Sequence, residues 1–406
     1  MNLRRFLKRS VAALGAAVGA GSAHAQAPAP DDPSKVLGGP KRPYGERSRF
    51  ERTARGVPQP ATKTDEWGPS VTPLGESMGI ITPSSLHFEV HRGGVADVDP
   101  KKHRLLIHGM VDRPVILTVD DIKRLPSVSR IYFIECAGNT LTEWEGPAAP
   151  TVDWTHGLTS CSEWTGVPLS LLLREVGVRK GAAWIIAEGA DATGNERSIP
   201  IAKAMDDVLI AYGQNGEALR PENGYPLRLF VPGWEGNVNV KWLRRLTVVD
   251  RPYMTRMETV EHAGLMPDGK ARRLMFVMDA KSVITFPSGG QRLRGPGLYE
   301  ITGLAWTGRG RIRRVDVSTD RGHAWRRATL QEPVLPLAHV RFSLPWRWDG
   351  REAVLQSRCV DETGYEQPTL RDLVKVRGVN STFHLNAIQS WKVAADGAVS
   401  NAYGAA

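Results

Sequence analysis

The frequency of glycine and proline constrains the fold of this 406-residue chain more than any other feature. The sequence contains 41 Gly, 28 Pro and 12 Trp. Glycine and proline end helices and mark turns, so the sequence predicts many short strands joined by turns rather than long helices. The length exceeds that of one ordinary hydrophobic core, and we therefore expect two domains behind an exported leader.

The first 25 residues are typical of a cleavable export signal. Bases cluster at residues 4–9, a small apolar stretch follows at residues 11–23, and A-H-A at residues 23–25 provides a cleavage site. The apolar stretch is shorter than the roughly 20 residues that a membrane-spanning helix needs. The sequence R-R-F-L-K at residues 4–8 resembles a twin-arginine motif that lacks one residue, and that route exports folded proteins. We therefore predict a periplasmic protein without a membrane span.

Charge and cysteine content narrow the class of protein. The formal net charge is +10, with the bases scattered among acids. No basic stripe interleaved with aromatic residues occurs, so the sequence disfavours nucleic acid and favours an anionic substrate or an acidic protein partner. Three cysteines, Cys136, Cys161 and Cys359, are too few for a disulfide framework. A single bridge between Cys161 and Cys359 remains open.

Composition and local sequence patterns divide the chain after the leader into four segments. Residues 26–79 are rich in proline and charge, and we expect an extended N-terminal segment. Residues 80–255 mix short strands with a few helices, which predicts an α+β domain. Residues 256–395 consist of strand-like runs between glycine-rich turns, which predicts a β-sandwich of immunoglobulin type. Residues 396–406 are small and polar, and we expect a frayed tail.

Cys136 is the sharpest candidate for chemistry. It ends a β-prone run at residues 130–136 and enters an A-G-N turn, so a rigid strand would hold its sulfur at an edge lined by loops. The alternative is a buried, inert core cysteine, which is the commoner fate of a free cysteine. The spacing of the residues alone does not decide between the two.

Three blocks of sequence resemble the sulfite oxidase family of molybdopterin enzymes. They are I-E-C-A-G-N at residues 134–139, E-W-T-G-V-P-L at residues 163–169, and the stretch from V-P-G to K-W-L at residues 231–243. Within that family the chain is most similar to the molybdenum subunits of the Sox type of sulfane (sulfite) dehydrogenase. The runs at residues 211–217, 220–229 and 355–365 carry this closer likeness.

The resemblance implies a molybdopterin-binding α+β domain, followed by an immunoglobulin-like domain that pairs two subunits. Molybdenum and one molybdopterin are the implied cofactors, and Cys136 is the implied thiolate ligand, because a soft thiolate suits a metal already held by sulfur. The implied contacts to the cofactor are His91, Arg92, Ser198, Gly236, Asn237, Asn239 and Lys241.

The expected substrate site departs from the family. Val90 stands where the resemblance implies an arginine. Sulfite oxidases also carry an arginine after C-A-G-N, whereas this chain has the dipeptide T-L there. A less charged pocket suits a sulfane sulfur carried on a protein thiol better than free sulfite. Arg92, Trp164 and Arg358 are the candidates that shape this pocket. The alternatives are a surface ion pair for each arginine and a core aromatic for Trp164.

The implied activity is oxidation of sulfane sulfur or sulfite by oxygen-atom transfer. The chain has no C-x-x-C-H haem motif and too few cysteines for an iron–sulfur cluster beside its metal ligand. The electrons are therefore expected to leave for a separate acceptor, and the resemblance implies a dihaem cytochrome c subunit held in a hetero-oligomer. Two rivals remain: a simple sulfite dehydrogenase, and a non-catalytic binding module with the same fold.

Overall fold

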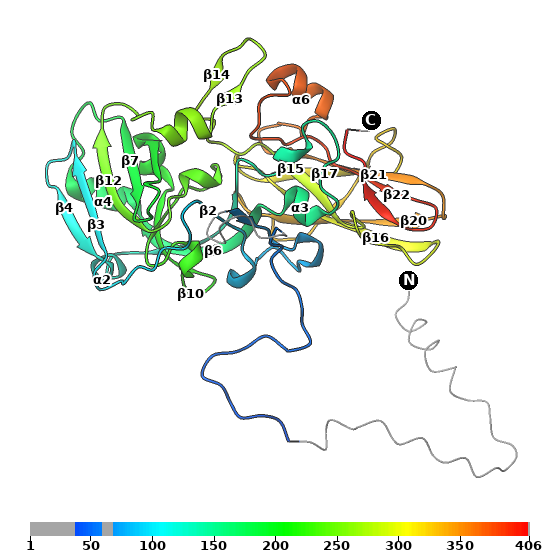
Figure 1. The fold of residues 1–406 in the computed structure, drawn as a ribbon, viewed down its shortest axis with the longest axis horizontal. Coiled ribbons are helices and arrows are strands. Elements are labelled where there is room, and N and C mark those ends of the chain that lie inside the picture. Colours follow the sequence, from blue (N-terminus) through cyan, green and yellow to red (C-terminus); the bar gives the residue numbers. More distant parts are fainter. Residues whose placement is uncertain (1–36, 59–67, 405–406) are drawn as a thin grey trace, which may run out of the picture. The chain divides into compact units, whose positions relative to one another are not determined.

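The computed structural model describes residues 37–58 and 68–404, so the predicted leader lies outside the described residues. The chain divides into two units, residues 1–52 and residues 53–406. Residues 37–52 of the first unit form turns and bends without a helix or strand. The second unit contains the sheets and helices (Figure 1).

Two five-stranded sheets form the first domain of this unit. One has the order β4–β3–β12–β7–β8, with bounds Val115–Thr118, Arg104–Gly109, Leu243–Val249, Trp184–Gly189 and Glu196–Pro200. The other has the order β10–β9–β6–β5, and β11 also pairs with β9. Its bounds are Glu217–Ala218, Leu209–Gln214, Thr159–Pro168, Val128–Glu135 and, for β11, Arg228–Phe230.

Short helices connect and cover these sheets. The α-helices of the first domain are α2 (Val119–Lys123), α3 (Val152–His156), α4 (Leu169–Val176) and α5 (Ile201–Asp206). Single turns are η2 (Leu74–Glu76), η3 (Ser84–Leu86), η4 (Leu141–Glu143), η5 (Pro221–Asn223), η6 (Gly236–Val238) and the π-helical η7 (Met257–Glu261). In the described part of the chain, no helix has the length and apolar character to cross a membrane.

Helix α4 shows how the sequence produces these elements. Leu169, Leu172, Leu173 and Val176 are all buried, and their spacing of three and four residues places them on one face of the helix. Gly177 ends the helix with a φ of 69°, a conformation that glycine adopts without steric cost. The apolar face packs into the hydrophobic core between the helices and the first sheet.

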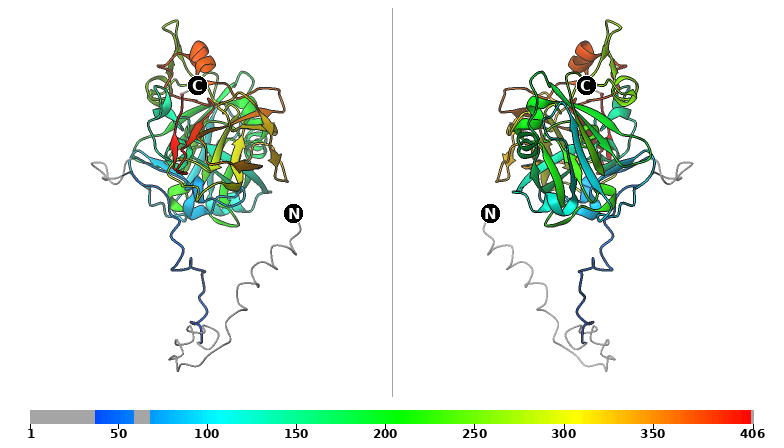
Figure 2. Two further views of the ribbon diagram at one scale, coloured as in Figure 1. Left: turned by 90° about the vertical axis from the view of Figure 1, so that its right-hand side faces the viewer. Right: turned by 90° about the vertical axis from the view of Figure 1, so that its left-hand side faces the viewer.

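The second domain is a sandwich of two sheets, as predicted. One sheet has the order β15–β16–β20–β19 and the other β18–β17–β21–β22–β23. The bounds of the first sheet are Lys281–Phe286, Gly297–Trp306, Val340–Trp348 and Thr329–Leu330, and those of the second are Arg326–Arg327, Ile312–Ser318, Ala353–Asp361, Ser390–Val393 and Val399–Asn401. Helix α6 (Leu370–Arg377) lies beside the hairpin of β13 (Gly264–Leu265) and β14 (Ala271–Arg272) (Figures 1 and 2).

The hydrophobic core of the sandwich continues into the first domain. Phe133 of β5 and Cys161 of β6 belong to the same buried cluster as Trp306 and Trp391 of the sandwich. Strands β5 and β6 pair antiparallel from Val128 to Glu135. The end of β5 therefore lies at the junction of the two domains, and Cys136 follows directly.

The expectation for the C-terminal tail is corrected, whereas the extended N-terminal segment stays a prediction. The predicted frayed tail contains β23, whose Asn401 pairs with Trp391, and Tyr403 is buried. Strand pairing at the sheet edge outweighs the small, polar composition of this segment. The extended segment predicted to reach residue 79 contains β1 (Gly68–Ser70), which pairs with β2 (Glu89–His91), and Leu74 is buried in the core.

Candidate active site

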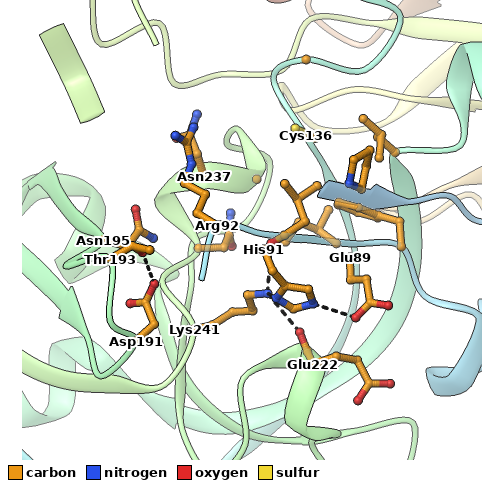
Figure 3. Close-up of a pocket in the computed structure, with 18 of the residues that line it drawn as sticks. Glu89, His91, Arg92, Cys136, Asp191, Thr193, Asn195, Glu222, Asn237 and Lys241 are labelled. Atoms are coloured by element: carbon orange, nitrogen blue, oxygen red, sulfur yellow. Dashed lines mark hydrogen bonds and ion pairs between the residues drawn. The ribbon is translucent and has the colours of Figure 1, made fainter. Parts of the chain in front are cut away.

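A pocket of about 380 Å³ opens where β2, the end of β5 and the turns η5 to η7 converge. Figure 3 shows Cys136 on one side of it and Lys241 and Asp191 on the other. The pocket brings together six of the seven cofactor contacts that the sequence predicts, all except Ser198. The predicted residues that line it are Cys136, His91, Arg92, Gly236, Asn237, Asn239 and Lys241.

Cys136 reaches the pocket because β5 stops at Glu135. The Cys136 amide donates to the Leu158 carbonyl at 2.9 Å, and the Asn139 amide donates to the Cys136 carbonyl at 2.9 Å, which closes the A-G-N turn. Burial raises the pKa of the Cys136 thiol to about 11, with the nearby Glu135 and Glu235 adding to the effect. The thiol therefore stays protonated near neutral pH unless a bound cation takes the proton's place.

The other two cysteines have a different environment. Cys161 and Cys359 are completely buried, and both are free thiols. The bridge between them that the sequence left open does not form. Neither lines the pocket, so Cys136 is the cysteine available for metal chemistry.

The turn η6 packs closely against the end of β5. A Cβ atom on Gly236 would lie 2.9 Å from the Glu135 carbonyl oxygen, so this position requires glycine. The next residue, Asn237, lines the pocket, and both polar atoms of its side chain are buried without a hydrogen-bond partner. A buried amide without partners is costly unless a ligand supplies them, so Asn237 indicates a polar ligand.

In contrast to Asn237, the side chain of Asn239 is bonded within the protein. Its side-chain oxygen accepts a bond from the Val231 amide at 2.7 Å, and its nitrogen donates to the Glu235 carbonyl at 3.0 Å. These bonds tie η6 to the chain that follows β11. Both side-chain atoms are satisfied within the protein, although the residue lies at the pocket wall.

Lys241 is held by three acceptors at the far end of the pocket. Its ammonium nitrogen lies 2.9 Å from His91 Nδ1, 3.2 Å from the Val90 carbonyl and 3.1 Å from the Glu222 carbonyl. Burial, together with the charge of Arg228, lowers the pKa of Lys241 to about 7. A phosphate at this end would stabilise the charged form of the lysine.

His91 is fixed from its other side. Glu89 lies 2.7 Å from His91 Nε2 and also pairs with Arg55 at 2.8 Å. Burial alone would raise the pKa of Glu89, but the bond from His91 and the charge of Arg55 lower it overall. An ionised Glu89 keeps the proton on His91 Nε2, which leaves Nδ1 to accept from Lys241.

Three residues that the sequence reasoning missed carry buried, unpartnered atoms in the pocket. These are His87 Nε2, Arg197 Nε and Arg228 Nε. Burial lowers the pKa of His87 to about 3, so this imidazole is neutral. The signal for Arg228 was present in the sequence, because a charged residue interrupts an otherwise apolar strand there.

Three predicted site residues, Ser198, Trp164 and Arg358, do not line the pocket. The Ser198 hydroxyl is buried against Glu258 at 3.1 Å, while its neighbour Arg197 faces the pocket. Trp164 is completely buried, donates to the Tyr132 carbonyl at 3.2 Å and stacks under Arg228. Arg358 lies on β21 and pairs with Glu366 at 2.9 Å. Trp164 thus has the surroundings of a core aromatic, and Arg358 those of an ion pair.

The wall around Cys136 is largely apolar. Leu141, exposed at 42%, and Phe383 of the second domain lie close to the Cys136 sulfur around Gly138. Val90, exposed at 36%, lines the same pocket. Phe383 stacks on His262 with ring centres 5.2 Å apart. The charges nearby belong to Arg92, which pairs with Glu261 at 3.1 Å, and to Arg197.

These residues fit a molybdopterin with its metal. Among the described residues, no group of three or more His, Cys, Asp or Glu side chains could hold a metal ion. A metal at this site would thus need most of its ligands from an organic cofactor, with Cys136 as the protein ligand. The unpartnered atoms of Asn237, Arg197 and Arg228 provide donors and an acceptor for such a cofactor.

Comparisons with known proteins agree with this site. Residues 92–257 match the family described as oxidoreductase molybdopterin binding domain. Residues 272–391 match the Mo-co oxidoreductase dimerisation domain. The chain therefore belongs to the sulfite oxidase family of molybdopterin oxidoreductases, and its cofactor is the molybdenum cofactor of that family.

Individual relatives support this assignment. The crystal structure of the sulfane dehydrogenase SoxCD from Paracoccus pantotrophus is 46% identical, with a TM-score of 0.89 over 91% of this chain and 97% of that chain. Mitochondrial sulfite oxidase of Drosophila melanogaster is 33% identical over 69% of this chain and 52% of its own length. The NADH nitrate reductase of Ulva prolifera is 32% identical over 61% of this chain and 32% of its own. The chain thus spans about half or less of these two curated relatives.

Proposed function

We propose that this protein oxidises a sulfane sulfur, carried on a protein thiol, in the periplasm and passes the electrons to a c-type cytochrome. The observation that carries the proposal is the position of Cys136, whose sulfur faces a pocket with an apolar wall and unpartnered buried polar groups. The similarity to a sulfane dehydrogenase supports this choice of substrate.

We assign different roles to the residues of the pocket. Cys136 would bind the metal, while Asn237, Arg228 and Lys241 would hold the organic part of the cofactor. When bound, the cofactor supplies two-electron oxygen-atom transfer to sulfur. Val90 and Leu141 would contact the uncharged carrier of the sulfur, and Arg197 would orient the oxygen atoms that the product gains.

A second candidate is oxidation of free sulfite. Arg92 and Arg197 line the pocket and offer positive charge to an oxyanion, which favours this substrate. Position 90 is a valine, whereas the family resemblance implies an arginine there, and this difference disfavours sulfite as the substrate. The non-catalytic binding module is disfavoured, because such a module has no need of a free cysteine at this position.

A steady-state comparison tests the proposal. The purified holoprotein is mixed with sulfite, thiosulfate or a protein persulfide, and cytochrome c reduction is followed. We expect the highest kcat/KM with the persulfide, and a single reduction of the metal without turnover when the acceptor is omitted. Sulfite as the best substrate would select the second candidate, and no reduction by any of the three would refute both.

The quaternary structure belongs to the same proposal. We propose a homodimer through the second domain, which matches a dimerisation family, and a hetero-oligomer with a dihaem cytochrome c subunit. The acceptor must be a separate molecule, because the sequence contains no C-x-x-C-H motif. Export by the predicted twin-arginine leader would deliver the folded, cofactor-loaded chain to the periplasm.

A further inference from the structure

The residue that precedes Cys136 is a fully buried carboxylate held by the second domain. Glu135 is completely inaccessible to solvent, and so is its partner Lys281, at 1% exposure. The Lys281 nitrogen lies 2.6 Å from Glu135 Oε1. The Trp306 indole donates to Glu135 Oε2 at 2.7 Å. Lys281 begins β15 and Trp306 ends β16, so both partners come from the sandwich.

The same carboxylate reaches forward into the cysteine turn. The Asn139 side chain donates to Glu135 Oε1 at 2.9 Å. Its oxygen accepts from the Leu158 amide at 3.1 Å, and Leu158 in turn accepts from the Cys136 amide. Thr140, at the end of the turn, has a φ of 76°, a strained conformation for a β-branched residue. Its hydroxyl lies 3.5 Å from Lys281.

The second domain also holds the residue that follows the cysteine. The His384 amide donates to the Ala137 carbonyl at 2.9 Å. The His384 ring lies 3.1 Å from Glu235 Oε2, next to Gly236 of η6. Contacts from the second domain thus flank Cys136 on both sides, at Glu135 and at Ala137.

We propose that the second domain positions the metal-binding thiolate, with Glu135 as the main positioning residue, in addition to any role in pairing subunits. This inference rests on the proposed role of Cys136 as the metal ligand. A buried ion pair is often no more stabilising than an apolar pair of similar volume. Its value here lies in the hydrogen bonds that fix the turn, because these set the direction of the Cys136 sulfur.

Two double variants separate anchoring from stability. Both Glu135→Leu/Lys281→Met and Glu135→Gln/Lys281→Met remove the buried charges and keep similar volumes. Only the glutamine variant keeps an oxygen that can accept from Asn139 or Trp306. Hydrogen–deuterium exchange of the full-length holoprotein then reports on residues 136–141 and, as an internal control, on the strands of the sandwich.

We expect exchange at residues 136–141 to be about tenfold faster in the leucine variant, and within about threefold of wild type in the glutamine variant. Exchange in β22 and β23 should not change. The Mo(V) electron paramagnetic resonance spectrum should shift in the leucine variant alone. Unchanged exchange at residues 136–141 in a folded leucine variant would overturn the inference, as would an equal increase throughout both domains.

A milder variant covers the case in which the leucine variant does not fold. Trp306→Phe removes one donor to Glu135 and keeps an aromatic ring in the core. We expect about threefold faster exchange confined to residues 136–141, and no change there would overturn the inference. If wild-type protein contains no molybdenum, the proposed function fails, but the exchange result still decides whether the second domain anchors the turn.

Discussion

The two ends of the pocket are built differently. At one end, the apolar side chains of Leu141 and Phe383 lie close to the Cys136 sulfur around Gly138. At the other, Lys241 is surrounded by His91 and the Glu222 carbonyl, with Glu89 behind them (Figure 3). The first end suits a thiolate, a metal and a sulfur carrier of little charge. The second suits the polar, phosphate-bearing end of an organic cofactor.

The difference suggests that one end of the pocket binds the cofactor and that the other end determines the substrate. We propose that the polar end holds the cofactor. The departures from sulfite oxidases that the resemblance implies, at Val90 and after the C-A-G-N sequence, concern the substrate instead. Variants at the two ends should therefore affect different measurements.

The largest expected effect comes from Cys136→Ser at the apolar end. A serine hydroxyl is a poor ligand for a metal that prefers sulfur, so we expect kcat to fall roughly 100-fold or more while the molybdopterin content stays near that of wild type. Steady-state kinetics and pterin fluorescence measure the two quantities. Full activity of the metallated variant would contradict the assignment of the ligand.

The substrate preference is tested by Val90→Arg. A charge-assisted hydrogen bond to a sulfite oxygen should lower the KM for sulfite about tenfold, with little effect on molybdenum content. Val95→Arg is the matched control, because Val95 is exposed at 45% and does not line the pocket. An equal effect of both variants would indicate general electrostatic attraction rather than a pocket contact.

Alanine variants of Asn237 and Asn239 test which of the two side chains binds the cofactor. We expect Asn237→Ala to reduce cofactor retention about threefold with little change in the free energy of unfolding, because its amide atoms are unpartnered in the protein. Asn239→Ala should cost about 1–3 kcal/mol of stability, because it leaves the Val231 amide unpaired. Denaturant unfolding and elution of bound pterin distinguish the two, and a reversed pattern would exclude the assignment of Asn237.

The smallest expected effect is a pH dependence from Lys241. Burial lowers its pKa to about 7 in the cofactor-free protein, whereas the unfolded chain titrates near 10.4. Between these values the unfolded state binds more protons, so the stability of the cofactor-free protein should rise with pH from about 7 to 10. Below pH 7 both states are protonated, and the cost of the buried charge is fully present.

The measurement compares wild type with Lys241→Met. We expect the difference in denaturant midpoint to shift in favour of wild type as the pH is raised from 6.5 to 9.5, values chosen from the window above. An unchanged difference over this pH range would show that the lysine stays charged in the folded, cofactor-free protein.

Local sequence patterns predicted much of the fold. The limits of α4 and of β17 follow directly from apolar spacing and from the turn residues that flank them. Residues 326–330 lie among the strand-like runs of the second domain, but they form two short strands, β18 and β19, which belong to different sheets. Only tertiary pairing decides where a strand crosses from one sheet to another.

The sequence predicted those residues of the candidate site that belong to a recognisable sequence motif. Cys136, Gly236 and Asn237 lie on such motifs, and all three line the pocket. Ser198 does not line the pocket, because neighbouring residues face opposite sides of a strand and Arg197 is the one that faces it. Arg358 lies opposite Asp316 in the sandwich, a pairing that is set by long-range contacts and that the local sequence does not reveal.

The coupling of the domains was not visible in the sequence. Glu135 and Lys281 are 146 residues apart and belong to different domains. Each alone suggests an ordinary charged residue of a strand. The structure shows that they form one buried pair beside the cysteine, so the second domain takes part in building the site.

X-ray absorption at the molybdenum edge tests the central claim most directly. We expect the wild-type protein to contain molybdenum bound by the sulfurs of its cofactor and by Cys136. The spectrum of Cys136→Ser should then fit one sulfur ligand fewer per molybdenum, with the remaining sulfur distances unchanged. An identical number of sulfur ligands in the two proteins would contradict the claim that Cys136 binds the metal.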